Sequence, residues 1–396
     1  MKWKEKGYEL DRFGNMISDR FKKCKKIYVF GAGMFGSELK LLLDKYGCFA
    51  GFIDNNVRKQ ETGYLGSRVL SLTEYMKKYS DSWIIIAASI LEEGNGRSIR
   101  NQLEDHGFEN GKDFFGMSEF LGRILPVLSV YYFDKMFMQL VQICLTERCS
   151  LKCKKCAHGC YAVDKNAKDM DFEMVCNSAD SFFDKVNLIH EFVLIGGEPL
   201  LYKNIENIVQ YIGERYRDQI AIFSITTNGT IMPWQELIDI CRQYDVTFRI
   251  SNYSRQLPWL ERKYEALVSV LAENQIHYTL APADVEWMDY GFEYVDRIAD
   301  EETLERVFDE CRTPCREVRG NRLYYCVMAR SVSDNLKMGI GADDYLDLSM
   351  LNNTKADRKV LLEYTLGYSD KGYLEMCRHC HGKNASDFKI PAAEQM

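Results

Sequence analysis

The sequence predicts an α/β protein of several domains, and three observations support this class. Residues 26–120 alternate short apolar strands with helical stretches, and residues 141–300 repeat the alternation with longer loops. After residue 300 the pattern changes to a helix, a hairpin and a cysteine-rich tail, which we assign to residues 301–396. Because alternating strands and helices predict parallel sheets covered by helices, we expect two parallel-sheet domains followed by a small α+β extension.

Composition and charge restrict the class of partner. The 396 residues, 46% of them hydrophobic, can fill a core in each of two or three domains. The net charge is −7, and the only dense basic run is the short patch at residues 22–26, so a nucleic-acid partner is disfavoured. No apolar stretch approaches the roughly 20 residues that a membrane span needs, and the charged N-terminus lacks a signal core. We therefore expect a cytoplasmic protein without a membrane span.

The first domain contains a glycine-rich turn after its first strand. Residues 1–25 are predicted to form a polar helical lead-in, and the following strand runs into a turn that carries Gly31, Gly33 and Gly36. Asp54 ends the next strand. This arrangement is typical of a dinucleotide-binding unit, in which the glycines form the turn, a helix N-terminus binds phosphate and the carboxylate binds a ribose diol.

The same segment resembles the Rossmann-like domains attached to bacterial sugar-modifying and glycan-assembly proteins. In those relatives a nicotinamide cofactor is often not implied. A nucleotide or nucleotide-sugar site, a structural role and a partner-docking role therefore stay open as alternatives for this domain.

The second alternation follows an apolar connecting helix predicted at residues 121–140. Its loops are rich in Gly, Cys, Asn or Ser at the carboxyl end of each strand, which is where a β/α barrel places its chemistry. The predicted strands are residues 141–145, 191–195, 220–226, 246–251 and 276–280.

Three cysteines follow the first of these strands at gaps of three and two residues. Cys149, Cys153 and Cys156 can surround one centre from a single loop. A cubane [4Fe–4S] cluster has four irons, so three thiolates leave one iron open for another ligand. The alternative is a structural zinc site in which His158 supplies the fourth ligand.

A second motif follows the next strand, and it consists of Gly196, Gly197, Glu198 and Pro199. With both motifs in this order, residues 140–280 resemble the radical S-adenosylmethionine (SAM) superfamily. The resemblance implies a partial (β/α)6-type barrel, a [4Fe–4S] cluster on the three cysteines, and SAM bound at the open iron. It also implies that the second motif hydrogen-bonds the methionine amino group of SAM.

The resemblance extends to two further loops and has one departure. Thr227, Asn228 and Ser251 match positions that place short polar side chains near the ribose and carboxylate of SAM, although each also fits a capping residue of a strand-to-helix loop. The family usually has an aromatic residue before the third cysteine, whereas this chain has Lys155. The implied chemistry cleaves SAM to a 5′-deoxyadenosyl radical and requires an electron donor such as flavodoxin or ferredoxin.

The tail carries a second group of cysteines. Cys315 and Cys326 are symmetric about Gly320 and Asn321, a dipeptide suited to a two-residue turn, so they fall opposite each other in a hairpin. A Cys-x2-Cys pair follows at residues 377 and 380.

This arrangement resembles the twitch or SPASM extension that holds an auxiliary [4Fe–4S] cluster. The resemblance implies Cys326, Cys377 and Cys380 as ligands with either Cys311 or Cys315 as the first one, and the hairpin geometry favours Cys315. A zinc ribbon-like site is the alternative.

The substrate expectation follows from these resemblances. We expect a small-molecule or glycan substrate, namely a sugar, nucleotide sugar or glycan precursor that is oxidised or epimerised. The alternative is a maturase of ribosomal peptides (RiPPs) of the SPASM type. A third class is an iron–sulfur protein without SAM chemistry, and the sequence identifies no general acid or base.

Overall fold

A computed structural model describes residues 1–78, 81–88, 91–297, 300–311, 313, 315–338, 341 and 344–396. The described chain divides into two compact units, Glu5–Gln139 and a larger unit made of Met1–Lys4 with Leu140–Met396. This division places the expected lead-in and connecting helices in the N-terminal unit and joins the expected barrel and extension in the larger one. The predicted mixed α/β class with parallel sheets is confirmed.

The N-terminal unit contains a five-stranded parallel sheet in the order β3-β2-β1-β4-β5, counted over the described residues. The chain order reverses between β1 and β4, as in doubly wound folds. Both of these strands are apolar and buried at every position, which is typical of parallel strands covered by helices on both faces. The strands are β1 Ile27–Phe30, β2 Phe49–Ile53, β3 Val69–Leu70, β4 Trp83–Ile86 and β5 Phe114–Gly116.

Seven α-helices and one π-helical segment belong to this unit within the described ranges. They are α1 Tyr8–Cys24, α2 Met34–Lys45, α3 Val57–Thr62, α4 Leu72–Lys78, α5 Gly94–Asp105, α6 Met117–Glu119, the π-helical Phe120–Ile124 and α7 Leu125–Tyr131. α1 packs against α7, so the lead-in and the connecting segment cover each other.

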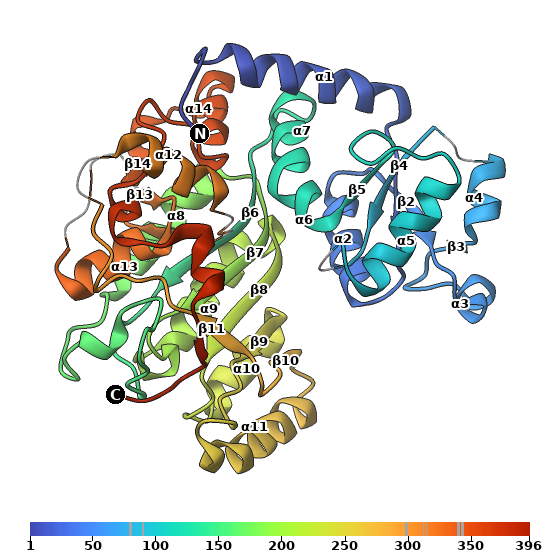
Figure 1. The fold of residues 1–396 in the computed structure, drawn as a ribbon. Helices are drawn as coiled ribbons and strands as arrows, with labels where there is room; N and C mark the ends of the chain where they lie inside the picture. Colours follow the sequence, from blue (N-terminus) through green and yellow to red (C-terminus); the bar gives the residue numbers. More distant parts are fainter. Residues whose placement is uncertain are drawn as a thin grey trace. The chain divides into compact units, whose positions relative to one another are not determined.

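The larger unit is built on one sheet in the order β10-β9-β8-β7-β6-β12-β13-β14, again counted over the described residues. Figure 1 shows β6 to β10 side by side in chain order. The sequence-predicted strands of this region are confirmed as β6 Phe137–Cys144, β7 Leu188–Ile195, β8 Ile220–Thr227, β9 Val246–Ile250 and β10 Tyr278–Leu280. Parallel strands bring their carboxyl ends to one edge, so the loops that follow them lie together.

The cysteine-bearing hairpin extends this sheet. β12 Arg316–Arg319 pairs in parallel with β6 and antiparallel with β13 Arg322–Tyr324, which in turn pairs with β14 Tyr345–Asp347. The pairs of β12 and β13 are symmetric about the predicted turn, so the predicted hairpin register is confirmed. Backbone hydrogen bonding to β6 therefore makes the tail a continuation of the barrel sheet.

Helices cover one face of this sheet. Phe192 on β7 is buried and contacts Phe182 and Phe183 of α8, with ring centroids 5.9 and 5.0 Å apart. The helices of the larger unit, within the described residues, are α8 Phe172–Lys185, α9 Ile205–Tyr216, α10 Gln235–Gln243, α11 Glu261–Glu273, α12 Glu301–Glu310, α13 Val327–Leu336 and α14 Lys355–Thr365. Short 3₁₀ turns occur at Cys160–Ala162, Pro199–Leu201, Arg217–Gln219, Pro258–Leu260, Leu348–Met350, Glu375–His379 and Gly382–Asp387.

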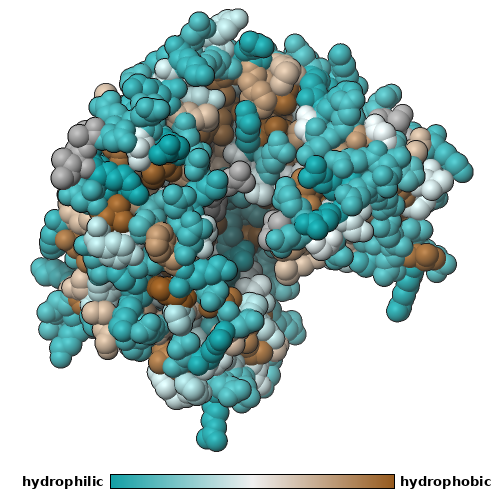
Figure 2. Space-filling model, in the orientation of Figure 1, coloured by the Kyte–Doolittle hydropathy of each residue, from teal (hydrophilic) through white to brown (hydrophobic). Residues whose placement is uncertain are grey.

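A two-stranded ribbon connects the end of the barrel with the end of the chain. β11 Glu286–Met288 pairs antiparallel with β15 Lys389–Pro391, so the last residues are returned to the loops of the parallel strands. No helix within the described residues is long and apolar enough to cross a membrane. The face shown in Figure 2 is mostly hydrophilic, with its hydrophobic side chains in small scattered groups.

Candidate functional site

The loop after β6 and the loop after β7 are in direct backbone contact. The Gly197 N–H donates to the Thr146 carbonyl (2.8 Å), and the Glu198 N–H donates to the Arg148 carbonyl (2.9 Å). A Cβ on Gly196 would lie 2.5 Å from the Thr146 oxygen, and one on Gly197 would lie 2.3 Å from the Arg148 oxygen. The two glycines are therefore required for the contact between the loops, a reason that sequence analysis did not provide.

An ion pair between Arg148 and Asp169 stabilises the cysteine loop. The Arg148 guanidinium donates to both Asp169 carboxylate oxygens (2.8 and 2.6 Å) and to the Leu201 carbonyl (2.9 Å). Thr146 Oγ1 donates to the same carboxylate (2.6 Å). Paired guanidinium hydrogen bonds of this kind fix geometry, so the loop is ordered by the protein itself. Neither residue forms part of a recognisable spacing, and sequence analysis missed both.

Each cysteine of the loop receives a hydrogen-bond donor. Cys149 Sγ accepts from the Leu151 N–H (3.5 Å) and from Asn228 Nδ2 (3.6 Å). Cys153 Sγ accepts from Gln395 Nε2 (3.2 Å). A hydrogen bond from the Cys160 thiol, followed by backbone N–H groups, lowers the pKa of Cys156. Donors to sulfur favour the thiolate, which is the form that binds metal.

The three thiols also interact with one another. The pKa of Cys153 is raised to about 12, mainly by burial and also by the charges of Cys156 and Cys149. Burial raises the pKa of Cys149 to about 11, with Cys156 again contributing. A shared cluster would remove this repulsion, because the irons neutralise the thiolates. Within the described ranges no three Cys, His, Asp or Glu side chains are close enough to hold a single metal ion.

His158, the fourth ligand in the zinc alternative, lies near Glu147 and Arg330. Burial lowers the pKa of His158 to about 4, with Glu147 raising it and Arg330 lowering it. Its electrostatic partners are thus a carboxylate and a guanidinium. The three thiols together with their donors fit a cluster that needs three protein ligands.

Glu198 connects two loops. Its carboxylate is fully buried and accepts hydrogen bonds from the Leu200 N–H (3.2 Å), Thr227 Oγ1 (2.8 Å) and the Asn228 N–H (2.8 Å). Burial raises the pKa of Glu198 to about 7, while these donors lower it. The carboxylate therefore orders the loop after β8, in addition to the contact with SAM that the family resemblance implies for this motif.

The remaining expected polar residues converge on the same loops. Asn228 Nδ2 also donates to Ser150 Oγ (3.2 Å), which joins the loop after β8 to the cysteine loop. The Ser251 N–H donates to the Thr227 carbonyl (2.9 Å), and Tyr264 Oη donates to the Ser251 carbonyl (3.0 Å). The structure thus brings together the loops that follow β6, β7, β8 and β9.

Lys155, the departure from the family pattern, faces a different segment. Its ammonium group lies 2.7 Å from Glu293 and 3.7 Å from Asp289, and 4.8 Å from the ring centroid of Tyr294. Aromatic side chains reach the cysteine loop from elsewhere. Leu151 and Cys153 form a small core with Ala393, against which Tyr253, Leu257 and Trp287 pack.

A polar patch lies on the face of the sheet turned away from the helices. Ser224 Oγ donates to Glu191 Oε1 (2.7 Å), and Arg249 forms a bidentate ion pair with Glu191, with Nη2 2.8 Å from Oε2. Glu191 and Ser224 are buried, whereas 36% of the Arg249 side chain is exposed. A charged pair on the inner strands of a sheet places donors and acceptors where a β/α barrel binds its substrate.

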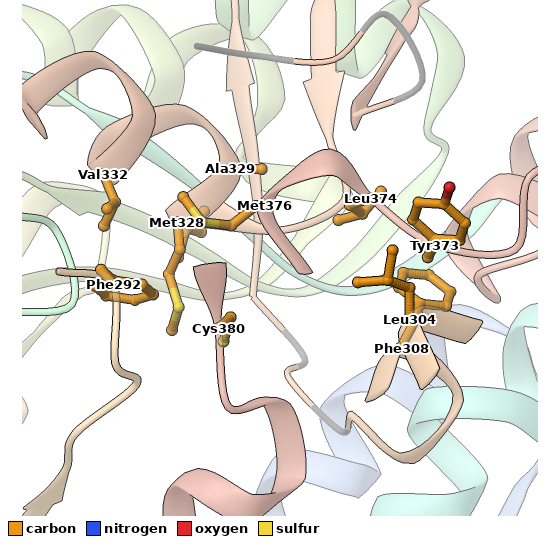
Figure 3. Close-up of a cluster of buried hydrophobic side chains, with 11 residues drawn as sticks. Phe292, Leu304, Phe308, Met328, Ala329, Val332, Tyr373, Leu374, Met376 and Cys380 are labelled. Atoms are coloured by element: carbon orange, nitrogen blue, oxygen red, sulfur yellow. The ribbon is translucent and has the colours of Figure 1, made fainter. Parts of the chain in front are cut away.

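The cysteines of the tail surround a second core. Figure 3 shows Cys380 between Met328 and Phe292 on one side and Leu304, Phe308 and Tyr373 on the other. Cys326 is the N-cap residue of α13; burial raises the pKa of its thiol, and the backbone N–H groups of Ala329 and Met328 lower it. The Gly382 N–H donates to Cys380 Sγ (3.2 Å). These donors favour thiolates, as around the first loop.

Cys311 and Cys315 differ in their electrostatic effect on the other tail cysteines. Burial raises the pKa of Cys326, Cys377 and Cys380, and the charge of Cys311 raises it further in all three. Burial also raises the pKa of Cys315, but the charges that act on it are Arg316 and Glu191. Cys315 packs against the same core as Cys326, Cys377 and Cys380, but of the two candidates it is Cys311 whose charge raises the pKa of all three, which favours Cys311 as the fourth ligand.

In the N-terminal unit, the expected ribose acceptor is engaged by its own chain. Asp54 Oδ2 accepts from the Ala32 N–H (2.8 Å) and lies 3.4 Å from Lys59 Nζ, and its Oδ1 accepts from the Asn56 N–H (2.8 Å). A Cβ on Gly36 would lie 2.1 Å from the Gly31 carbonyl oxygen, so this glycine serves helix-to-turn packing. These contacts give Asp54 and Gly36 structural roles in the unit.

Comparison with known proteins identifies the class. The radical SAM superfamily model matches residues 143–251, so this part of the chain is a radical SAM domain. This superfamily implies a [4Fe–4S] cluster and SAM as cofactors.

The relatives are similar over part of the chain. An uncharacterized protein of Methanocaldococcus jannaschii is 34% identical over 122 residues, which are 31% of this chain and 41% of that protein. A GTP 3′,8-cyclase of Ectopseudomonas mendocina is 29% identical over 23% of this chain and 26% of its own length. The chain thus spans less than half the length of these curated relatives. The solved structure of BtrN in complex with AdoMet and 2-DOIA gives a TM-score of 0.37 at 15% identity, covering 65% of this chain and 97% of that chain.

Proposed function

We propose that this chain is a radical SAM enzyme that modifies a small polyhydroxylated molecule, such as a sugar, a nucleotide sugar or a glycan precursor. The observation that carries the proposal is the convergence of Cys149, Cys153 and Cys156 with the Gly196–Pro199 loop inside the segment that matches the superfamily. An electron donor such as flavodoxin or ferredoxin would supply the reducing electron.

The residues of the first loop would hold the cluster by its three thiolates. When bound, the reduced cluster and SAM supply a 5′-deoxyadenosyl radical that removes a hydrogen atom from the substrate. The protein supplies order and exclusion of water. Arg148 and Asp169 fix the loop, the two glycines bring the next loop against it, and Glu198 sets the position of Asn228 beside Cys149.

The polar patch of Glu191, Ser224 and Arg249 supports the substrate class. Hydroxyl groups both donate and accept, so they match a surface on which a carboxylate and a guanidinium stand side by side. Because Glu191 neutralises Arg249, the patch favours a neutral polar group over an isolated anion. The charge of Glu191 also raises the pKa of Cys315, which packs against the core that contains Cys380.

We include an auxiliary [4Fe–4S] cluster in the proposal, bound by Cys311, Cys326, Cys377 and Cys380. Its position in a sheet continuous with β6 would let it accept the second electron when an alcohol is oxidised to a ketone. Oxidation leaves the product two hydrogens short, whereas epimerisation leaves its mass unchanged, so the mass of the product separates the two outcomes. A nucleotide site in the N-terminal unit would require Asp54 to exchange its present partners.

The proposal is tested by anaerobic reconstitution followed by reduction and addition of SAM. We expect release of 5′-deoxyadenosine that is lost in Cys149→Ala, Cys153→Ala and Cys156→Ala but kept in Cys24→Ala, since Cys24 lies in the N-terminal unit. Nucleotide sugars and free cyclitols are then screened for product formation coupled to this release. SAM cleavage that persists without the three cysteines would contradict the proposal. If product forms only from a precursor peptide, the substrate is a peptide and the proposed substrate class is wrong.

A further inference from the structure

The last residues of the chain pair with the cysteine loop. Cys153 and Gln395 form an antiparallel bridge, in which the Lys154 N–H donates to the Glu394 carbonyl (2.6 Å) and the Met396 N–H donates to the Lys152 carbonyl (2.8 Å). Figure 1 shows the red C-terminal end beside the green segment that follows β6. We call residues 393–396 the C-terminal strap. It adds a strand-like partner to the cysteine loop.

The side chain of Gln395 is oriented by two of its own bonds. Its Oε1 accepts from the Lys152 N–H (2.9 Å), and its Nε2 donates to the Ala393 carbonyl (2.7 Å). A backbone N–H only donates and a carbonyl only accepts, so the oxygen and nitrogen of this amide cannot be exchanged. The second N–H of Nε2 then points at Cys153 Sγ (3.2 Å).

The strap is held in place by packing as well. Ala393 is fully buried and forms a core with Leu151 and Cys153, so the strap covers the cysteine loop on this side. β15 delivers the strap from the β11 ribbon, which fixes its direction. Three features therefore fix the Gln395 donor to Cys153. They are the backbone pairing of the strap, the buried methyl group of Ala393 and the two other hydrogen bonds of the Gln395 amide.

We propose that Gln395 is a positioning residue for the first cluster, and that its N–H···S hydrogen bond raises the reduction potential of that cluster. Reduction adds negative charge that spreads over the thiolate sulfurs, so a fixed donor stabilises the reduced form more than the oxidised form. A less negative potential makes the electron easier to deliver to the site. This inference rests on the proposed function, since it requires a cluster on Cys153.

The test compares variants of the strap in the reconstituted full-length protein. Gln395→Met keeps the length of the side chain and removes the donor. Gln395→Glu keeps its shape and the bond from Lys152, and replaces the donor with a carboxylate oxygen. Met396→Leu is the matched control, because this side chain is 73% exposed and its backbone pairing is unchanged. Redox titration followed by electron paramagnetic resonance gives the potential, and the signal that changes on addition of SAM belongs to the first cluster.

We expect a more negative midpoint potential in Gln395→Met, a further negative shift in Gln395→Glu, and the wild-type value in Met396→Leu. A wild-type potential in Gln395→Met with an intact cluster would overturn the inference. Should both Gln395 variants lose the first cluster, an unchanged melting temperature supports the positioning role, whereas a parallel loss of melting temperature overturns it. If the wild-type protein itself shows no SAM-responsive signal, the proposed function fails instead.

Discussion

Arg330 of α13 forms a buried ion pair with Glu147, which lies two residues before Cys149. The guanidinium is fully buried and also pairs with Glu317 on β12, whose other oxygen accepts from Gln142 of β6 (3.1 Å). Arg330 therefore connects the start of the first cysteine loop, through Glu147, with the hairpin strand β12, through Glu317. The two cysteine groups are connected through a rigid charged network.

Replacing Arg330 should destabilise the protein strongly. Arg330→Met would leave Glu317 buried without its cation, which costs on the order of 3–5 kcal/mol of unfolding free energy. Chemical denaturation at equal iron content measures this loss. Arg330→Met combined with Glu317→Gln should recover part of it, because Glu317, the fully buried carboxylate of the network, then carries no uncompensated charge. Arg68→Met, at a side chain that is 60% exposed and pairs with Glu74, is the control and should change stability by less than about 1 kcal/mol. An Arg330→Met protein as stable as the control would contradict this account.

Gly197→Ala should displace the cysteine loop. The added Cβ would lie 2.3 Å from the Arg148 carbonyl oxygen, so the two loops must separate. We expect loss of the iron bound at the first site, together with a lowered melting temperature. Gly33→Ala is the matched control, since a Cβ there meets no atom within 4 Å and the residue has an extended φ of −133°. Full iron content in Gly197→Ala would show that the loop contact is adaptable.

The cysteine variants should separate the two candidate ligands of the auxiliary cluster. We expect iron to fall from about eight to about four atoms per chain in Cys311→Ala and to stay at about eight in Cys315→Ala. The reason is that Cys311 acts on Cys326, Cys377 and Cys380, whereas Cys315 interacts with Arg316 and Glu191. The opposite result would restore the choice made from the hairpin geometry, and four iron atoms in the wild-type protein would remove the auxiliary cluster.

His190 on β7 should make stability depend on pH. Burial lowers its pKa from 6.5 to about 4, so between these values the unfolded chain binds a proton that the folded chain does not. This contribution to stability is present above pH 6.5 and is lost as the pH falls. Relative to His190→Gln, the wild-type protein should lose about 2 kcal/mol of unfolding free energy between pH 7.5 and 5. Parallel stability curves for the two proteins would mean that His190 ionises normally in the folded state.

The strands and the motif loops could be predicted from sequence because they depend on local pattern. Apolar runs such as that of β7 form buried strands wherever helices can cover them, and the symmetric hairpin around Gly320 follows from turn chemistry. The spacing of Cys149, Cys153 and Cys156 likewise identified the candidate cluster loop before any tertiary contact was known, and the family match includes this loop.

Tertiary structure decided the contacts that join residues distant in sequence. Gln395 reaches Cys153 across 242 residues, and Arg330 reaches Glu147 across 183 residues. No spacing rule connects such pairs, because their meeting depends on how β12 and β15 join the parallel strands. The same applies to Cys311 and Cys315, where the backbone register favoured Cys315 and the charges that act on the other tail cysteines favoured Cys311. The sequence alone therefore determined the candidate metal ligands, because their spacing is local, and the packing determined which distant residues contact them.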